Sequence, residues 1–308
     1  SPADAIPPSS PMVAPWLRDE SASILTAYTA ADAPAAGTPE RKKLASRVEG
    51  FMFFYIHAMR LGWGSSVLET SGGALQLMLA VQEDGDRELA QVGKMGLELC
   101  STSATNQAVA SFLIDTTQAI ITSTDSWRVR SACIDFVREV GHTFALHAPT
   151  RTRCMMLIQE VGLLDTVPEV RQASCASLAS FLRMASPDHI QSILANAPKP
   201  RRRGGKAPGE GKSDEERAAM LVRRHAKALG VAACVLSFPT ELPEWMADAV
   251  ASLCRLQGEE ATMTATVSKA VGDFKKSHQD VWNIVKTTWT EDQLQLLSDV
   301  SGTQTYYS

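Results

Sequence analysis

The sequence predicts an all-α protein, a HEAT/ARM-type α-solenoid of helical hairpins, and three observations support this prediction. Apolar residues recur at spacings of three and four, as in Leu44, Val48 and Phe51, which is the period of a helix face. The strict alternation typical of strands is scarce. The motif V-R-x-A occurs at Val129 and again 41 residues later at Val170, within the period of about 40 to 47 residues of HEAT-type repeats. A compact helical bundle is the alternative fold.

Composition divides the chain into five parts. Residues 1–15 carry five prolines and are expected to form an extended lead-in. Residues 16–196 show the helical period throughout and are expected to form HEAT-like repeats. Residues 197–213 are rich in proline, glycine and cations, which is typical of a flexible basic loop. Helices are expected to resume in a C-terminal HEAT-like domain over residues 214–302, and residues 303–308 form a tail.

Proline and glycine predict the helix boundaries, with breaks at residues 33–39, 62–66 and 83–86 and before Pro149, Pro168 and Pro187. The C-terminal helices are expected over about 214–238, 244–256, 260–285 with a break near Gly272, and 291–301. Thr290 and Gln293 match a capping box at the start of the last helix. Trp289 and Leu294 match a hydrophobic staple at the same place. Gly302 suits the position just after its end.

Charge and cysteine content exclude several classes of protein. The 308 residues carry 30 Lys and Arg against 34 Asp and Glu, a net charge of −4, so no global attraction to nucleic acid is expected. No apolar run reaches the roughly 18 residues of a membrane span, so no membrane partner is expected. The six cysteines lack the close spacing of zinc sites and are expected to be core residues. The start lacks a secretory signal pattern, which predicts a reducing compartment and free thiols.

Catalytic motifs are lacking, so we expect no enzyme activity, no metal and no assignable cofactor. The six histidines form no H-E-x-x-H motif and no pair spaced by four. The glycine stretches GWGSS and SGGA lack the lysine and hydroxyl residue of a phosphate-binding loop. A cryptic enzyme with a Cys–His pair formed in space is the alternative.

The basic loop contains a dense run of cations, namely Lys199, Arg201, Arg202, Arg203 and Lys206. A nuclear import signal is the interpretation we favour, because an import receptor binds an accessible basic segment. A patch for an acidic partner and a solvated loop are the alternatives. Sequence-specific nucleic-acid binding is not expected, because no aromatic residues alternate with the cations to stack on bases.

The tail ends in Tyr306, Tyr307 and Ser308. Two tyrosines offer large apolar surface with few rotatable bonds, and a terminal carboxylate can pair with a lysine or with backbone amides. The tail is therefore expected to act as a peptide ligand. A frayed terminus is the alternative.

Four segments carry a family resemblance: RRHAKALGVAACVLSFPTELPEWM, VGDFKKSHQDVW, TEDQLQLLSDV and TYYS. Over about residues 215–308 the chain resembles the C-terminal region of the large single-chain HEAT-repeat proteasome activators, the family of proteasome activator complex subunit four. The segment VPEVRQASCASLASFL and the basic loop fit the same family less specifically, and residues 1–120 are compatible with its helical repeats. Members of the family are much longer, so we expect this chain to be their last portion.

The resemblance implies a cap on the α ring of the proteasome core particle that admits peptides or unfolded proteins without ATP. It also implies a role in ubiquitin-independent degradation and DNA repair in the nucleus and cytoplasm. In the family, a hydrophobic-Tyr-any terminus enters a pocket between adjacent α subunits. Here Tyr306 matches the hydrophobic position, Tyr307 the tyrosine and Ser308 the carboxylate, and binding would bias the gate toward its open state. A generic HEAT scaffold or transport adaptor with an inert tail is the rival function.

Two further family properties concern ligands. The family is described as reading acetylated histones, and Asp273-Phe274 matches the proposed acetyl-lysine contact. The family pattern has Asn before Phe, whereas an ionised Asp273 accepts hydrogen bonds and cannot donate one to an acetyl carbonyl. Inositol phosphates bind basic openings in the family, but no residue of this chain is assigned to them.

Overall fold

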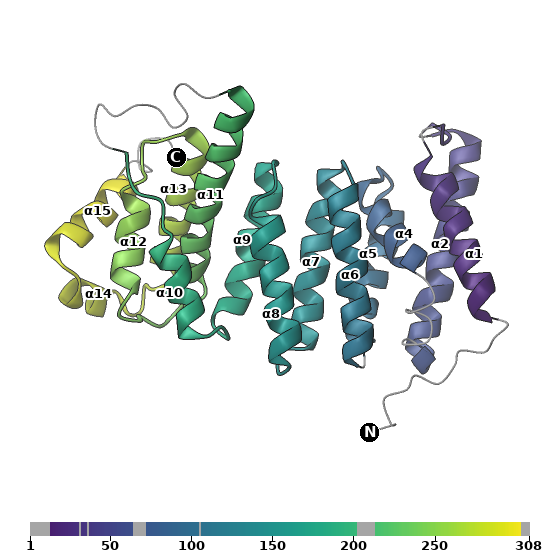
Figure 1. Cartoon of the computed structure of the whole chain (residues 1–308), viewed down its shortest axis with the longest axis horizontal. Helices are drawn as coiled ribbons and strands as arrows, with labels where there is room; N and C mark the ends of the chain where they lie inside the picture. The colour runs from purple at the N-terminus through teal and green to yellow at the C-terminus, as the bar shows by residue number, and fades with distance from the viewer. Residues whose placement is uncertain are drawn as a thin grey trace. The chain divides into compact units, whose positions relative to one another are not determined.

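The computed structural model describes residues 13–30, 32–35, 37–63, 72–104, 106–201 and 213–302. Within these ranges the regular secondary structure is entirely helical (Figure 1), which confirms the predicted all-α helical-solenoid class. The chain divides into two compact units, Ser1–Leu157 and Ile158–Ser308, called here the first and the second unit.

The first unit is a series of helices in which neighbours along the chain pack on one another. Its elements are α1 Val13–Thr29, α2 Pro39–Ala58, the π-helix η2 Met59–Trp63, α4 Gly72–Ala80, the 3-10 helix η3 Val81–Glu83, α5 Arg87–Thr102, α6 Gln107–Ser123, α7 Trp127–Thr143 and α8 Ala148–Leu157. Helix α5 packs on α2, α4 and α7, and α6 packs on α7 and α8. This arrangement of successive helical pairs is the one the repeat period predicts.

Two glycines allow α5 to approach α4 and η3 closely. A Cβ added at Gly96 would lie 2.8 Å from Met78 Sδ, and one added at Gly93 would overlap Val81.

Asp86 caps the start of α5 by accepting hydrogen bonds from the amides of Glu88 (3.0 Å) and Leu89 (3.3 Å). The predicted break at residues 83–86 is thus confirmed, with a cap as its cause.

The second unit is built around one long helix. Its elements are η4 Ile158–Gly162 (a π-helix), α9 Pro168–Leu182, α10 Pro187–Ala195, α11 Asp214–Leu236, α12 Met246–Cys254, α13 Ala261–Ser277, α14 Trp282–Thr288 and α15 Glu291–Gly302. Helix α11 contacts α9, α10, α12 and α13 (Figure 1), and residues 225–235 of it are buried except for Lys227. A helix segment that is apolar all round belongs in a core, which explains the central place of α11.

The V-R-x-A motif has the same local geometry in both places. Arg130 in α7 donates through Nη1 to the carbonyls of Thr124 (3.1 Å) and Asp125 (2.9 Å). Arg171 in α9 donates through Nη1 to the equivalent carbonyls, Asp165 (2.6 Å) and Thr166 (2.9 Å). Each arginine binds the carbonyls five and six residues before it, so it fixes the turn that leads into its own helix.

Three predicted boundaries are wrong. Helix α1 begins at Val13 rather than after residue 15, and Pro15 lies in its first turn, where proline costs no hydrogen bond. The helix expected over 260–285 does not break at Gly272, which lies inside α13. It ends at Ser277 instead, and the following residue, His278, places Nδ1 3.0 Å from the Phe274 carbonyl at the helix end. Gly302 belongs to the last turn of α15.

Burial of the cysteines confirms their predicted role. All six are free thiols in the core, and burial raises the pKa of each, for example to about 12 at Cys100 and Cys175. Such thiols stay protonated at neutral pH and are poor nucleophiles. In the ranges that the structure describes, we find no helix that is both long enough and apolar enough to span a bilayer.

Candidate functional site

Helix α15 holds the residue from which the tail departs. Leu297 and Val300 are 1% and 2% exposed, and α15 packs on α12 and α13. The predicted capping box is confirmed, since the Gln293 amide donates to Thr290 Oγ1 (3.3 Å) and the Thr290 amide donates to Gln293 Oε1 (3.0 Å). Gln293 also donates through Nε2 to Asp248 Oδ1 of α12 (2.9 Å). These contacts fix the base of the tail on the second unit.

The predicted docking residues Tyr306, Tyr307 and Ser308 lie outside the described residues. The same holds for Arg202, Arg203 and Lys206 of the basic run.

The start of the basic run lies against two acidic residues between α12 and α13. Glu259 has a side chain only 6% exposed and accepts from Arg224 Nε and Nη2 through both oxygens, at distances of 2.7 to 3.1 Å. The Arg201 amide donates to Glu259 Oε1 (3.1 Å), and Arg224 Nη2 donates to the Lys199 carbonyl (2.7 Å). Arg201 Nη2 also lies 3.4 Å from Glu260 Oε1. These charge-assisted contacts hold the backbone of residues 199–201 on the second unit.

The side chain of Phe274 belongs to the core. It is 0% exposed, stacks on Trp289 (ring centroids 5.5 Å apart) and lies at a tilt against the His278 ring (4.3 Å). Asp273 is half-exposed, and its carboxylate lies 4.0 Å from Lys276 Nζ. The acetyl-lysine contact at Asp273 and Phe274 stays a prediction, and the structure gives Phe274 no accessible surface for it.

A buried polar triad, Arg171, His225 and Thr266, joins three helices of the second unit. Arg171 Nε donates to His225 Nδ1 (2.9 Å), and His225 Nε2 lies 2.8 Å from Thr266 Oγ1. The three residues are 4%, 3% and 5% exposed. Because Nδ1 accepts from the guanidinium, the imidazole is neutral and its Nε2–H donates to Thr266. Arg171 belongs to the repeated V-R-x-A motif, but no sequence motif or predicted site includes His225.

The pKa of His225 is lowered from 6.5 to about 4, first by burial and then by the Arg171 charge. The triad is closed to solvent and its arginine also bonds two loop carbonyls. We therefore assign it the structural role of fastening α9, α11 and α13 together.

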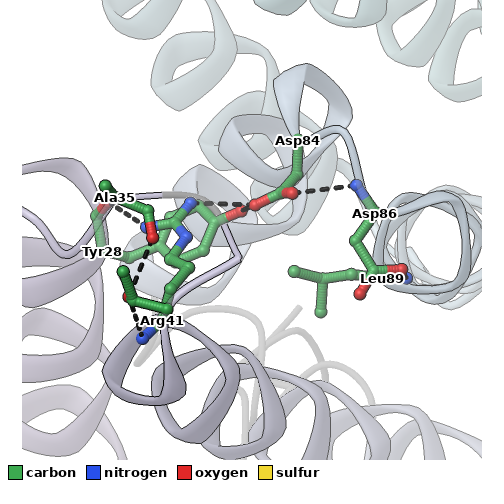
Figure 2. A network of polar contacts seen from close by, with 7 residues as sticks. Tyr28, Ala35, Arg41, Asp84, Asp86 and Leu89 are labelled. Carbon is green, nitrogen blue, oxygen red and sulfur yellow. Dashed lines mark hydrogen bonds and ion pairs between the residues drawn. The ribbon is translucent and has the colours of Figure 1, made fainter.

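A second polar network lies in the first unit and joins α1, α2 and the segment after η3. Figure 2 shows Tyr28, Arg41 and Asp84 meeting, with Asp86 beside Asp84. The Tyr28 hydroxyl donates to Asp84 Oδ2, Arg41 Nη2 donates to the same oxygen (2.8 Å), and the guanidinium lies 4.2 Å from the Tyr28 ring centroid. Burial and then the hydrogen bond to Asp84 raise the pKa of Tyr28, so the phenol stays protonated. Burial would raise the pKa of Asp84, but hydrogen bonds from Tyr28, Asp86 and Arg41 outweigh it and lower that pKa.

Replacing Asp84 with alanine is expected to destabilise the first unit by about 2 kcal/mol, because Tyr28 and Arg41 would each lose a partly buried partner. Three buried thiols in each unit report on that unit separately: Cys100, Cys133 and Cys154 in the first, and Cys175, Cys234 and Cys254 in the second. Alkylation of Cys100 should therefore begin at lower urea, while Cys234 keeps its midpoint. Exposed Glu83→Ala is the matched control, and equal midpoints for the two variants would contradict the prediction.

Among the residues that the structure describes, no three His, Cys, Asp or Glu side chains come together in a way that could hold a metal ion. The network of Tyr28, Arg41 and Asp84 and the triad around His225 each use their polar atoms internally. What the two units offer is a set of packed helical pairs with a fixed base for the tail. The fold and this site therefore define a helical-repeat protein of the α-solenoid class.

Comparison with known proteins finds similarity to a family of proteasome activators. The family described as "Proteasome activator complex subunit 4-like, C-terminal" matches residues 221–308. Proteasome activator subunit 4 of Arabidopsis thaliana is 29% identical over 265 residues, which cover 85% of this chain and 14% of the plant protein. Proteasome activator complex subunit 4 of Homo sapiens is 34% identical over 154 residues, covering 47% of this chain and 8% of the human protein. Proteasome activator complex subunit 4A of Danio rerio is 29% identical over 195 residues.

Residues 221–308 match the C-terminal region of this family, and the chain is similar to these family members over 47% to 85% of its own length. It spans only 8% to 14% of the length of these relatives.

Proposed function

We propose that this chain acts in an ATP-independent proteasome activator that docks on the α ring of the core particle through Tyr306, Tyr307 and Ser308. One observation carries the proposal. The family match runs from the middle of α11 through the anchored helix α15 and includes the three tail residues. We assign no catalytic step to the chain.

The attachment of helix α15 supports docking through the tail. Helix α15 is held by its apolar face and by its cap, so the tail starts from a fixed point. Six extended residues reach about 20 Å, which is long enough for Tyr307 to enter a pocket while the body stays outside. Tyr307 supplies aromatic surface and a hydroxyl, and the Ser308 carboxylate pairs with a cation of the pocket. A pocket that binds this tail better when the gate is open shifts the gate toward opening.

Replacing Tyr307 with alanine is expected to weaken binding to the core particle by about 2 kcal/mol, or roughly 30-fold, as for an aromatic hot spot. Deleting residues 306–308 should abolish binding. Binding and cleavage of a fluorogenic peptide are measured in the same samples, with core particle alone and chain alone as baselines. Gln304→Ala is the matched control in the tail and should change neither quantity.

The outcomes separate the rival functions. Loss of binding together with loss of stimulated cleavage supports docking through the tail. Binding that is unchanged by the deletion would place the contact on the helical body and overturn the site. Cleavage by the chain alone would favour the enzyme alternative. If the intact chain does not bind, the longer protein is tested with and without these three residues. Equal binding of its two versions would favour the scaffold alternative.

A further inference from the structure

A groove of about 300 Å³ lies on the second unit between η4, α10 and α11. Its floor is apolar. Ile193 of α10 is 8% exposed, and a Cβ added at Gly230 of α11 would lie 3.2 Å from Ile193 Cγ2, so the two helices meet closely there. Leu164, which follows η4, also lines the groove and remains 44% exposed, a large accessible surface for a leucine.

One rim of the groove is cationic. Arg223 and Lys227 lie one turn apart on α11, and both are exposed. Neither makes an ion pair with a carboxylate of the described part of the chain, whereas the neighbouring Arg224 is bound to Glu259. Two cations held beside an apolar floor attract a ligand that carries negative charge.

The opposite rim carries polar groups of η4. Gln159 Oε1 accepts from His189 Nε2 (3.0 Å), so its amide NH₂ remains able to donate to a ligand. Glu160 is the carboxylate on this side and is exposed. Turns of π-helix are often found at functional sites, and η4 is a π-helix.

We propose that this groove binds a peptide segment in which a leucine-like side chain is flanked by carboxylates. The aliphatic side chain lies over Leu164 and Ile193, and the carboxylates pair with Arg223 and Lys227. A nucleic acid fits poorly, because the groove offers apolar aliphatic surface and no aromatic ring for stacking. The inference goes beyond docking of the tail and does not depend on it.

The test uses a fluorescein-labelled decapeptide with two central leucines and glutamates on both sides. Fluorescence anisotropy is read against the intact chain at two salt concentrations. Binding should weaken at higher salt, because the charged contacts are at the surface. Versions with glutamine in place of glutamate and with serine in place of leucine should each bind more weakly.

Reversing the cationic rim gives the sharpest comparison. The double variant Arg223→Glu with Lys227→Glu should lower affinity for the acidic peptide about tenfold or more. A peptide with lysines in place of the glutamates should bind this variant better than it binds the original chain. Lys286→Glu reverses another exposed cation of the same unit and is the matched control. Leu164→Ser tests the apolar contact, and thermal melting confirms that all variants fold.

Three results would overturn the inference. The first is equal affinity of the double variant and the control for the acidic peptide. The second is equal binding of the serine peptide, which would indicate charge attraction without a groove. The third is self-association of the chain that the double variant abolishes, because the groove would then bind a second copy. Stimulation of proteasome peptidase activity is measured alongside, so failure of tail docking is distinguished from failure of the groove.

Discussion

Replacing Arg171 with alanine is expected to destabilise the second unit by about 3 to 4 kcal/mol. The change removes the donor to His225 Nδ1 and the donor to the carbonyls of Asp165 and Thr166. A buried group that loses its partner costs about 1 to 3 kcal/mol, and the cavity left by the side chain adds to this. Arg171→Lys keeps the positive charge but lacks the planar guanidinium with its several N–H donors. We therefore expect about half of the loss in the free energy of unfolding.

The buried thiols give the measurement. In the Arg171→Ala variant, Cys175 and Cys234 should become reactive at lower urea than in the original chain. Cys100 and Cys133 of the first unit should keep their midpoints. Gln172→Ala changes the neighbouring exposed residue of the same helix and should change the free energy of unfolding by less than about 0.5 kcal/mol. A change of that small size for Arg171→Ala would show that the triad does not stabilise the unit.

The sequence carries most of the information about the helices of this chain. Prolines mark the first turns of α2, α9 and α10, and the capping box at Thr290 appears in both sequence and structure. These signals act over three or four residues, so they can be recognised from local spacing. The end of α13 at Ser277 was missed because no proline or glycine marks it, and a histidine ring beside the carbonyl four residues earlier is not a recognised stop signal.

Contacts between distant residues could not be predicted in the same way. His225 lies 54 residues after Arg171, and Thr266 lies 41 residues after His225. The contact of Arg201 with Glu259 spans 58 residues. Each contact forms only when several helices pack together, and no short stretch of sequence determines that packing. The basic run was therefore predicted without the acidic residues that hold its start. The groove was missed for the same reason, since its two rims come from segments more than sixty residues apart, at Gln159 and Arg223.

Lowering the pH is expected to destabilise the second unit through His225. The pKa of His225 is 6.5 in the unfolded chain and about 4 in the folded unit, because burial and the Arg171 charge disfavour the imidazolium. Between these two values the unfolded chain binds more protons than the folded one, so stability falls as the pH falls. The contribution is complete above pH 6.5 and is lost progressively as the pH approaches 4. A shift of this size corresponds to a free energy on the order of 3 kcal/mol.

The measurement follows unfolding of the second unit in urea from pH 7.5 to 4.5, using Cys234 and dithiodipyridine, a thiol reagent that reacts in acid. His225→Gln keeps an acceptor for Arg171 and a donor for Thr266 but does not titrate. This variant should lose most of the slope of stability against pH between 6.5 and 4.5. Exposed His57→Gln, in the first unit, is the control and should leave the slope of the second unit unchanged. If His225→Gln leaves the slope of stability against pH unchanged, other groups set the acid sensitivity of the second unit. The pH dependence would then not come from a histidine that must stay neutral in the fold.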